Sequence, residues 1–161
     1  MNDLGKLKKD LVSLLKGNTA FANIKVTEEY PKVRDYPLRR PVISVGLDSA
    51  DMTSNIGKYL GYGIDGGEMQ GSTCMITLRF DLFCRDDGTD PHEIMEKLCG
   101  VLLFESGYSF TKLGCSEVQW DKDMGAVKLT VRGSFFAALT AGLLESGEFA
   151  EEVDIALAVN N

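Results

Sequence analysis

The sequence predicts an α+β fold, in which a mixed, mainly antiparallel sheet is packed by two helices and carries a projecting glycine-rich arm. Three observations predict it: residues 72–85 alternate like a strand and lead into a capped helix over 91–104; residues 3–16 form a second amphipathic pattern; and glycines punctuate residues 48–71. Because 161 residues fit one core of ordinary size, we expect a single domain over 1–161 with its arm at 48–71.

The strand at 72–85 and the helix after it have the clearest signals. Period-two alternation indicates a largely buried strand, with an apolar face formed by Cys74, Ile76, Leu78, Phe80, Leu82 and Cys84. The helix begins at Asp90 as N-cap, followed by Pro91 and by Glu93 at the capping-box position. We expect its apolar face to lie on the sheet; that face consists of Ile94, Met95, Leu98, Val101 and Leu102.

The remaining elements are predicted from weaker patterns. Gly17 and Asn18 end the helix at 3–16, and residues 21–29 and 42–47 predict strands joined by a proline-rich, extended connection. A short strand is expected at 108–112, and residues 115–121 and 126–136 predict an antiparallel hairpin. Residues 153–159 alternate like a last strand, whereas 137–147 fit no single element and the pairing order stays open.

Charge and cysteine usage restrict the class of protein. The net charge is −7, yet residues 1–40 hold nine Lys or Arg and five Asp or Glu, while residues 41–161 hold eight and nineteen. Because affinity for nucleic-acid phosphates comes from clustered Lys and Arg, we expect such a chain to bind nucleic acid poorly. No apolar run approaches the ~20 residues that span a bilayer, and no signal peptide is evident, so we expect a soluble protein with four reduced thiols.

None of the chemically suggestive residues forms a convincing catalytic or metal site. His92 and Cys99 lie about two helical turns apart, too far for a base and nucleophile to share a hydrogen bond. Cys74 and Cys84 lie on an apolar strand face, without metal-ligand spacing. The glycines of residues 61–67 lack the Lys-Ser/Thr of a phosphate-binding loop. The acids at 86, 87 and 90 suit a solvated turn and a helix cap better than a cation site. We therefore predict no catalytic residue, metal or cofactor.

Protein contacts are the better prediction for the remaining polar and aromatic clusters. Tyrosines in a projecting arm suit an interface, as aromatic residues do at interface cores. A basic cluster near the N-terminus could meet an acidic neighbour, and the last twenty residues carry five acids and no base. The candidate interface residues are Arg34, Arg39, Arg40, Lys58, Tyr59, Tyr62, Glu151, Glu152 and Asp154.

The layout of the chain resembles the phage tail terminator, or tail completion, family. The resemblance lies in the order of its elements: the helix at 4–16, the connection from Tyr30-Pro31 to Pro41-Val42-Ile43, the irregular arm, the 73–84 strand feeding the 91–104 helix, and the closing strand at 127–136. It covers most of the chain.

The resemblance implies a structural virion protein without enzymatic activity. Members form a hexameric ring that caps the tail tube, ends its polymerisation and provides the head-joining surface. The implied partners are sister copies, the tail tube protein and a head-tail connector protein, with no specific nucleic-acid binding and no membrane. The implied location is the virion tail, assembled in the host cytoplasm. An acidic ring lets DNA pass without sticking, because like charges repel.

Two other readings remain open from the sequence. Another tail tube or head-tail connector subunit would share this composition and also lack an active site. A small α/β ligand-binding module, or a cysteine enzyme using Cys99, would instead need a concave pocket with convergent polar groups.

Overall fold

The computed structural model describes residues 4–29, 38–52, 58–62, 66–141 and 153–156. Within these ranges the side chains of residues 4–5, 58–62, 68–72, 138–141 and 153–156 are not described, so only their backbone is considered.

One mixed sheet organises the described chain. Its central order is β1 (Lys25–Glu28), β2 (Val42–Met52), β4 (Glu68–Cys84), β7 (Ala126–Ala141) and β5 (Phe110–Cys115). Three shorter strands complete it: β3 (Lys58–Tyr62) pairs with β4, whereas β6 (Gln119–Asp121) and β8 (Val153–Ala156) pair with β7. Among these described strands only β1 and β2 pair in parallel, so the sheet is mixed and mainly antiparallel, as predicted.

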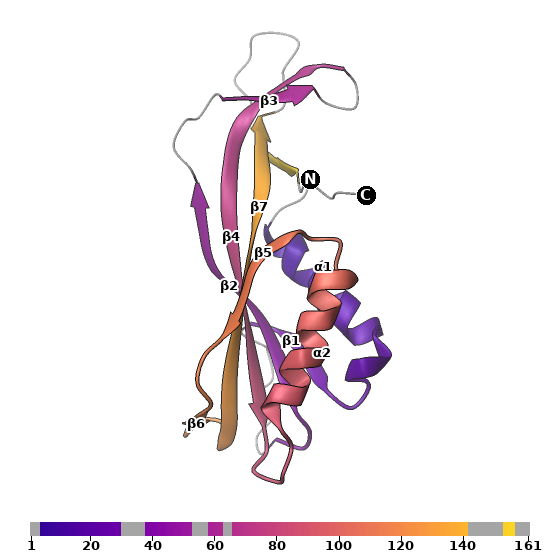
Figure 1. The fold of residues 1–161 in the computed structure, drawn as a ribbon, viewed down its shortest axis with the longest axis vertical. Coiled ribbons are helices and arrows are strands. Elements are labelled where there is room, and N and C mark those ends of the chain that lie inside the picture. The colour runs from indigo at the N-terminus through magenta and orange to yellow at the C-terminus, as the bar shows by residue number, and fades with distance from the viewer. Residues whose placement is uncertain (1–3, 30–37, 53–57, 63–65, 142–152, 157–161) are drawn as a thin grey trace.

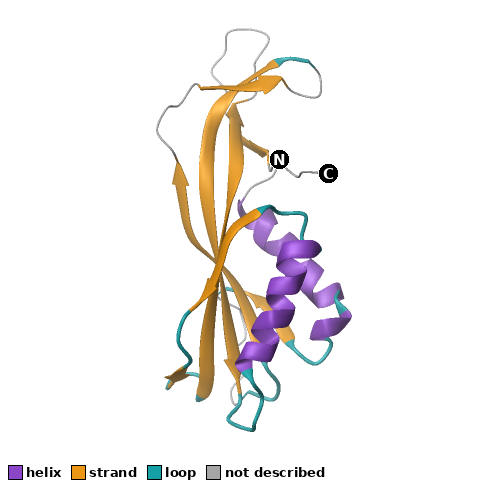
Figure 2. Ribbon diagram, in the orientation of Figure 1, coloured by secondary structure: helices purple, strands orange, loops and turns teal. Residues whose placement is uncertain are grey.

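Both helices pack on the same face of the sheet (Figures 1 and 2). Helix α1 (Leu4–Gly17) contacts β1 and β2, whereas α2 (Pro91–Phe104) contacts β4, β7 and β5. The side chain of Asp90 accepts a hydrogen bond from the His92 backbone N–H, which caps α2 at its N-terminus. The core between the layers is apolar; its fully buried side chains include Leu11, Leu15, Ile43, Val45, Leu78, Phe80, Leu82, Leu98, Leu102, Leu129 and Val131.

The two longest strands extend past the helices. β4 and β7 pair from Gln70 opposite Ala141 to Cys84 opposite Val127. In Figure 1 the upper part of this pair, with β3 and β8 beside it, projects beyond the ends of α1 and α2. The molecule is therefore elongated, with a two-layer body and a projecting β-structure.

The predicted arm at 48–71 is largely strand. Residues 48–52 continue β2, and β4 begins at Glu68, while 53–57 and 63–65 lie outside the described residues. The prediction ended β2 too early because Asp48, Ser49 and Ala50 have weak strand propensity. A β-bulge between Leu47 and Ser49 lets β2 resume pairing with β4, which overrides that preference.

Three other predicted boundaries were wrong. Residues 19–21 form a 3₁₀ turn, so β1 begins only at Lys25. Cys115 ends β5 rather than opening the hairpin strand: β5 pairs with β7 as far as Cys115 opposite Val131, and after a break at residues 116–118 the strand β6 pairs with β7 again. The ambiguous stretch after Phe136 continues β7 to Ala141, because pairing with β4 and β8 holds it extended.

Leu98→Ala tests the packing of α2 on the sheet. Leu98 is 0% exposed, so its truncation should lower the free energy of unfolding by about 2–5 kcal/mol through lost burial and a cavity. The same change at Leu103, which is 49% exposed on the same helix, should cost less than about 1 kcal/mol. Urea unfolding followed by circular dichroism measures both; equal losses would contradict the described packing.

Candidate functional site: the open face of the sheet

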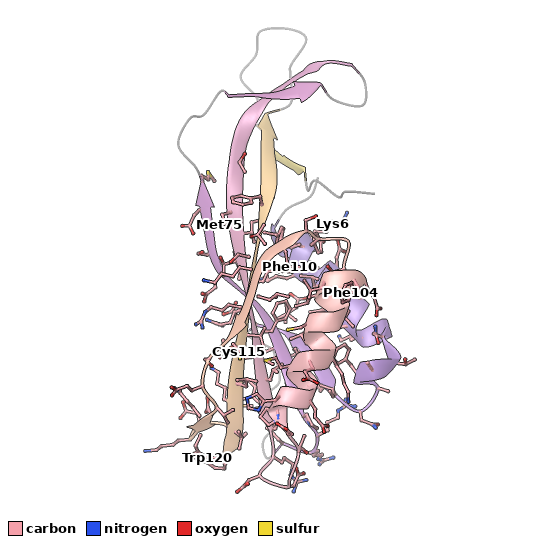
Figure 3. All side chains as sticks on the ribbon, in the orientation of Figure 1. Lys6, Met75, Phe104, Phe110, Cys115 and Trp120 are labelled. Atoms are coloured by element: carbon pink, nitrogen blue, oxygen red, sulfur yellow. The ribbon has the colours of Figure 1, made fainter. Side chains whose placement is uncertain are left out.

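The face of the sheet away from α1 and α2, here called the open face, is lined by charged side chains. Along β4 the even-numbered residues from Cys74 to Cys84 are buried against the helices. Alternation therefore directs Arg79 and Asp81 to the open face, and cross-strand pairing places Arg132 opposite Arg79 and Thr130 opposite Asp81. Figure 3 shows Met75, also odd-numbered on β4, on this helix-free side.

Arg79 is the centre of an ionic network that joins β2, β4, β7 and the residue after β1. Its guanidinium donates a hydrogen bond to Glu29, which follows β1. Its Nη1 lies 3.6 Å from Asp48 Oδ1 on β2, and its Nε lies 3.2 Å from Asp81 Oδ2, although at an angle that makes no hydrogen bond. Arg132 on β7 donates from Nε to the other carboxylate oxygen of Asp48 at 3.0 Å.

Asp81 is the most deeply placed member of this network. It is 8% exposed, and a buried carboxylate is costly unless it is paired and hydrogen-bonded. Thr130 Oγ1 donates to Asp81 Oδ1 at 2.7 Å, and Lys128 Nζ lies 3.4 Å from the same oxygen. The Lys128 ammonium also lies 5.4 Å from the centre of the Phe83 ring, within the range of a cation–π contact.

Gly46 makes room for the network. A Cβ atom at this position would lie 2.5 Å from Glu29 Oε2, closer than real Cβ contacts come. Glycine therefore allows the Glu29 carboxylate to lie over β2 and reach Arg79. Three carboxylates and three cations thus neutralise one another, an arrangement that fixes these side chains on the open face.

Large apolar side chains are exposed at separate places. On the open face Phe136 of β7 is 49% exposed and pairs across the strands with the half-buried Met75. On the other side of the molecule, Leu103 and Phe104 at the end of α2 are 49% and 85% exposed. Trp120 on β6, 55% exposed, lies near the lower end of the molecule in Figure 3. Exposed aromatic and aliphatic clusters with polar surroundings are typical of protein contacts.

The predicted interface residues are only partly described. Arg34, Glu151 and Glu152 lie outside the described residues; Lys58, Tyr59 and Tyr62 lie on β3 and Asp154 on β8, where only the backbone is described. Their interface role therefore stays a prediction.

Arg39 and Arg40 are described, and both are exposed. Arg39 lines an open pocket of about 390 Å³ together with Leu38, Arg85, Asp86 and Gly125. Two guanidiniums therefore line this pocket, and guanidiniums are the groups that most often bind carboxylate or phosphate in proteins. Arg85 also lies 3.8 Å from Asp87, so part of its charge is already balanced within the chain.

Three of the four thiols, those of Cys74, Cys84 and Cys99, are poorly suited to nucleophilic chemistry. Burial, and to a lesser extent the neighbouring Cys115, raises the pKa of Cys99. Burial likewise raises the pKa of Cys74, and it raises that of Cys84 to about 11, with contributions from Asp87 and Asp90. Since the thiolate is the reactive form, these shifts disfavour reaction near neutral pH.

His92 and the nearby acids form a local capping and turn structure. The His92 ring lies 3.2 Å from the same Asp90 oxygen that caps α2. Hydrogen bonds from Thr89, its hydroxyl first, lower the pKa of Asp87, and the His92 backbone N–H lowers that of Asp90. Among the described residues, no three His, Cys, Asp or Glu side chains are grouped to hold a metal ion. No described helix is long and apolar enough to cross a membrane.

Comparisons with known proteins leave the family of this chain open. No protein-family model matches it, and no curated protein matches it in sequence.

The ionic network could not be located from the sequence. Alternation over residues 72–85 does predict that Arg79 and Asp81 share a face. The other members of the network, Glu29, Asp48 and Arg132, belong to distant segments, and a register error of one residue would turn them to the other face. Only the pairing of β1, β2, β4 and β7 brings these charges together.

Replacing Arg79 with methionine tests the network. The change leaves three carboxylates without their shared cation, and should lower the free energy of unfolding by about 1–3 kcal/mol. Arg132→Met is the matched control, because Arg132 is half exposed and its ion pair within the described chain is with Asp48; it should cost about 0.2–1 kcal/mol. Chemical denaturation at low and high salt measures both, and a neutral Arg79→Met would show that the network does not stabilise the fold.

Proposed function

We propose that this protein is a structural virion protein that forms a hexameric ring on the end of a phage tail tube. The ring ends tube polymerisation and provides the surface that joins the tail to the head. The proposal takes its biological setting from the resemblance in element order, and it takes its physical support from the surfaces described above.

The observation that carries the proposal is the distribution of uncovered surface. Helices cover one face of the sheet, the open face is broad and charged, and the β4–β7 pair projects beyond the two-layer body (Figures 1 and 2). A ring subunit on a tube needs contacts in two directions: sideways to sister copies and along the ring axis to the tube and the connector. The helix layer and the open face of the two-layer body suit the sideways contacts between sister copies. The projecting strands suit the contacts along the ring axis.

The charge of the chain supports a ring that surrounds DNA without binding it. A net charge of −7 makes a channel lined by these subunits repel a phosphate backbone. Another tail tube or head-tail connector subunit is the nearest alternative, since it would need the same kinds of surface.

A small ligand-binding module is the second candidate, and the pocket beside Arg39 and Arg85 is the observation that favours it. The pocket is open to solvent, with two guanidiniums and one carboxylate around it, so a small anion is the chemical class it would take.

The assembly state of the purified chain tests the proposed function. We expect mass photometry and negative-stain imaging to show rings of six, and we expect the rings to cap one end of tail tubes and stop their growth. Mixing the protein with polymerising tube protein at increasing ratios should shorten the tubes.

The same assays, run with and without tail tubes, distinguish the alternatives. Subunits that copolymerise along the tube would indicate a tube role instead of a cap. A monodisperse monomer that ignores tubes, and that binds a small anion through Arg39 and Arg85, would contradict the proposal and favour the ligand-binding module.

A further inference from the structure

We infer that sister copies contact each other head to tail: the helix layer (α1 and α2) of one copy covers the open face of the next copy's sheet, with both in the same orientation. The inference rests on the proposed ring and names the contact that builds it. Such an interface joins two different patches, as rings require.

The open face has one acidic side and one basic side. On the open face the β1–β2 side carries Glu29, Asp48 and Asp51 against one base, Lys25. The β7–β5 side, with the neighbouring β6, carries Lys112, Lys128 and Arg132 against one acid, Asp121. Between them β4 contributes one charge of each sign, Arg79 and Asp81. The open face therefore presents an electrostatic gradient across the strands, even though several of its charges are paired with each other.

The helix layer has the opposite order of charge. Helix α1 carries Lys6, Lys8, Lys9 and Lys16 against Asp10 alone. Helix α2 and its C-cap carry Glu93, Glu96 and Glu105 against Lys97. The basic helix α1 packs against β1 and β2, and the acidic helix α2 packs against β4, β7 and β5.

These two gradients match when copies stack in the same orientation. A copy laid on the open face of its neighbour without turning puts basic α1 over the acidic β1–β2 side and acidic α2 over the basic β7–β5 side. Complementary potentials of this kind favour one register over others and speed association.

The exposed apolar side chains agree with the same register. α2 lies behind β4 and β7, so the stacked copy brings Leu103 and Phe104 over the β4–β7 part of the open face, where Met75 faces Phe136. In Figure 3, Met75 and Phe104 lie on opposite sides of the molecule, and both lie in the middle region of its long axis. A contact between patches at similar heights needs rotation with little shift along the axis, which is the condition for a closed ring rather than a helical filament.

Two single substitutions test the apolar part of this contact. Phe104→Asp and Phe136→Asp should each raise the protein concentration for half-assembly about ten-fold or more, because each places a carboxylate in the desolvated centre. Trp120→Asp is the matched control, since Trp120 is an exposed aromatic residue far from both patches, and it should leave assembly unchanged. Far-UV circular dichroism and thermal unfolding confirm that the variants are folded.

Charge reversal tests the direction of the contact. Glu96→Lys on α2 and Lys112→Glu on β5 should each weaken assembly when alone, because each puts like charges opposite one another in every contact. An equimolar mixture of the two variants should recover rings. In alternating copies, the lysine introduced on α2 of one variant meets the glutamate introduced on β5 of the other, and the unchanged Glu96 and Lys112 meet in the next contact. Mass photometry of each variant and of the mixture measures this recovery.

The outcomes separate this inference from the proposed function. If Phe104→Asp and Phe136→Asp both still form rings as the wild-type protein does, the head-to-tail contact is contradicted and the proposed ring is not. Loss of assembly in Phe136→Asp but not in Phe104→Asp would indicate two open faces packed against each other instead. A wild-type protein that stays monomeric would contradict both proposals.

Discussion

The pairing of β4 with β7 is the constraint on which the rest of the structure depends. These strands run antiparallel from Gln70 opposite Ala141 to Cys84 opposite Val127. Their register turns Leu78, Phe80 and Leu82 toward the helices, and it turns Arg79 and Asp81 to the other side. A slip of one residue would exchange the two faces, burying charge and exposing the core. One register therefore sets both the hydrophobic core and the open face.

The same pairing explains how the described chain can present two kinds of surface. Where the helices cover the sheet, β4 and β7 are part of a packed body; beyond the helices they project with β3 and β8 (Figure 1). Charges that neutralise one another within the open face keep it hydrated in the free subunit. They also reduce the cost of covering that face, since Glu29, Asp48 and Asp81 each already have a cation beside them.

Local signals predicted the helices and the centre of the sheet, whereas distant pairings decided the rest. Asp90 and Gly17 mark helix ends through their own chemistry, so α1 and α2 were predicted closely. The extent of β2 was missed because residues 48–52 are held extended by their partner strand, not by propensity. Glu29 reaches Arg79 only through the parallel pairing of β1 with β2, which no local pattern predicts. The predicted role of the arm tyrosines stays a prediction.

Hydroxyl-radical footprinting measures directly whether the open face is covered in the assembled protein. Hydroxyl radicals oxidise accessible Met and Phe side chains, so Met75 and Phe136 report whether this face is covered. We predict that both become protected when the protein is raised above its assembly concentration, that Phe104 becomes protected with them, and that Trp120 remains accessible. Unchanged oxidation of Met75 and Phe136 in assembled protein would contradict the claim that the open face is a contact between copies.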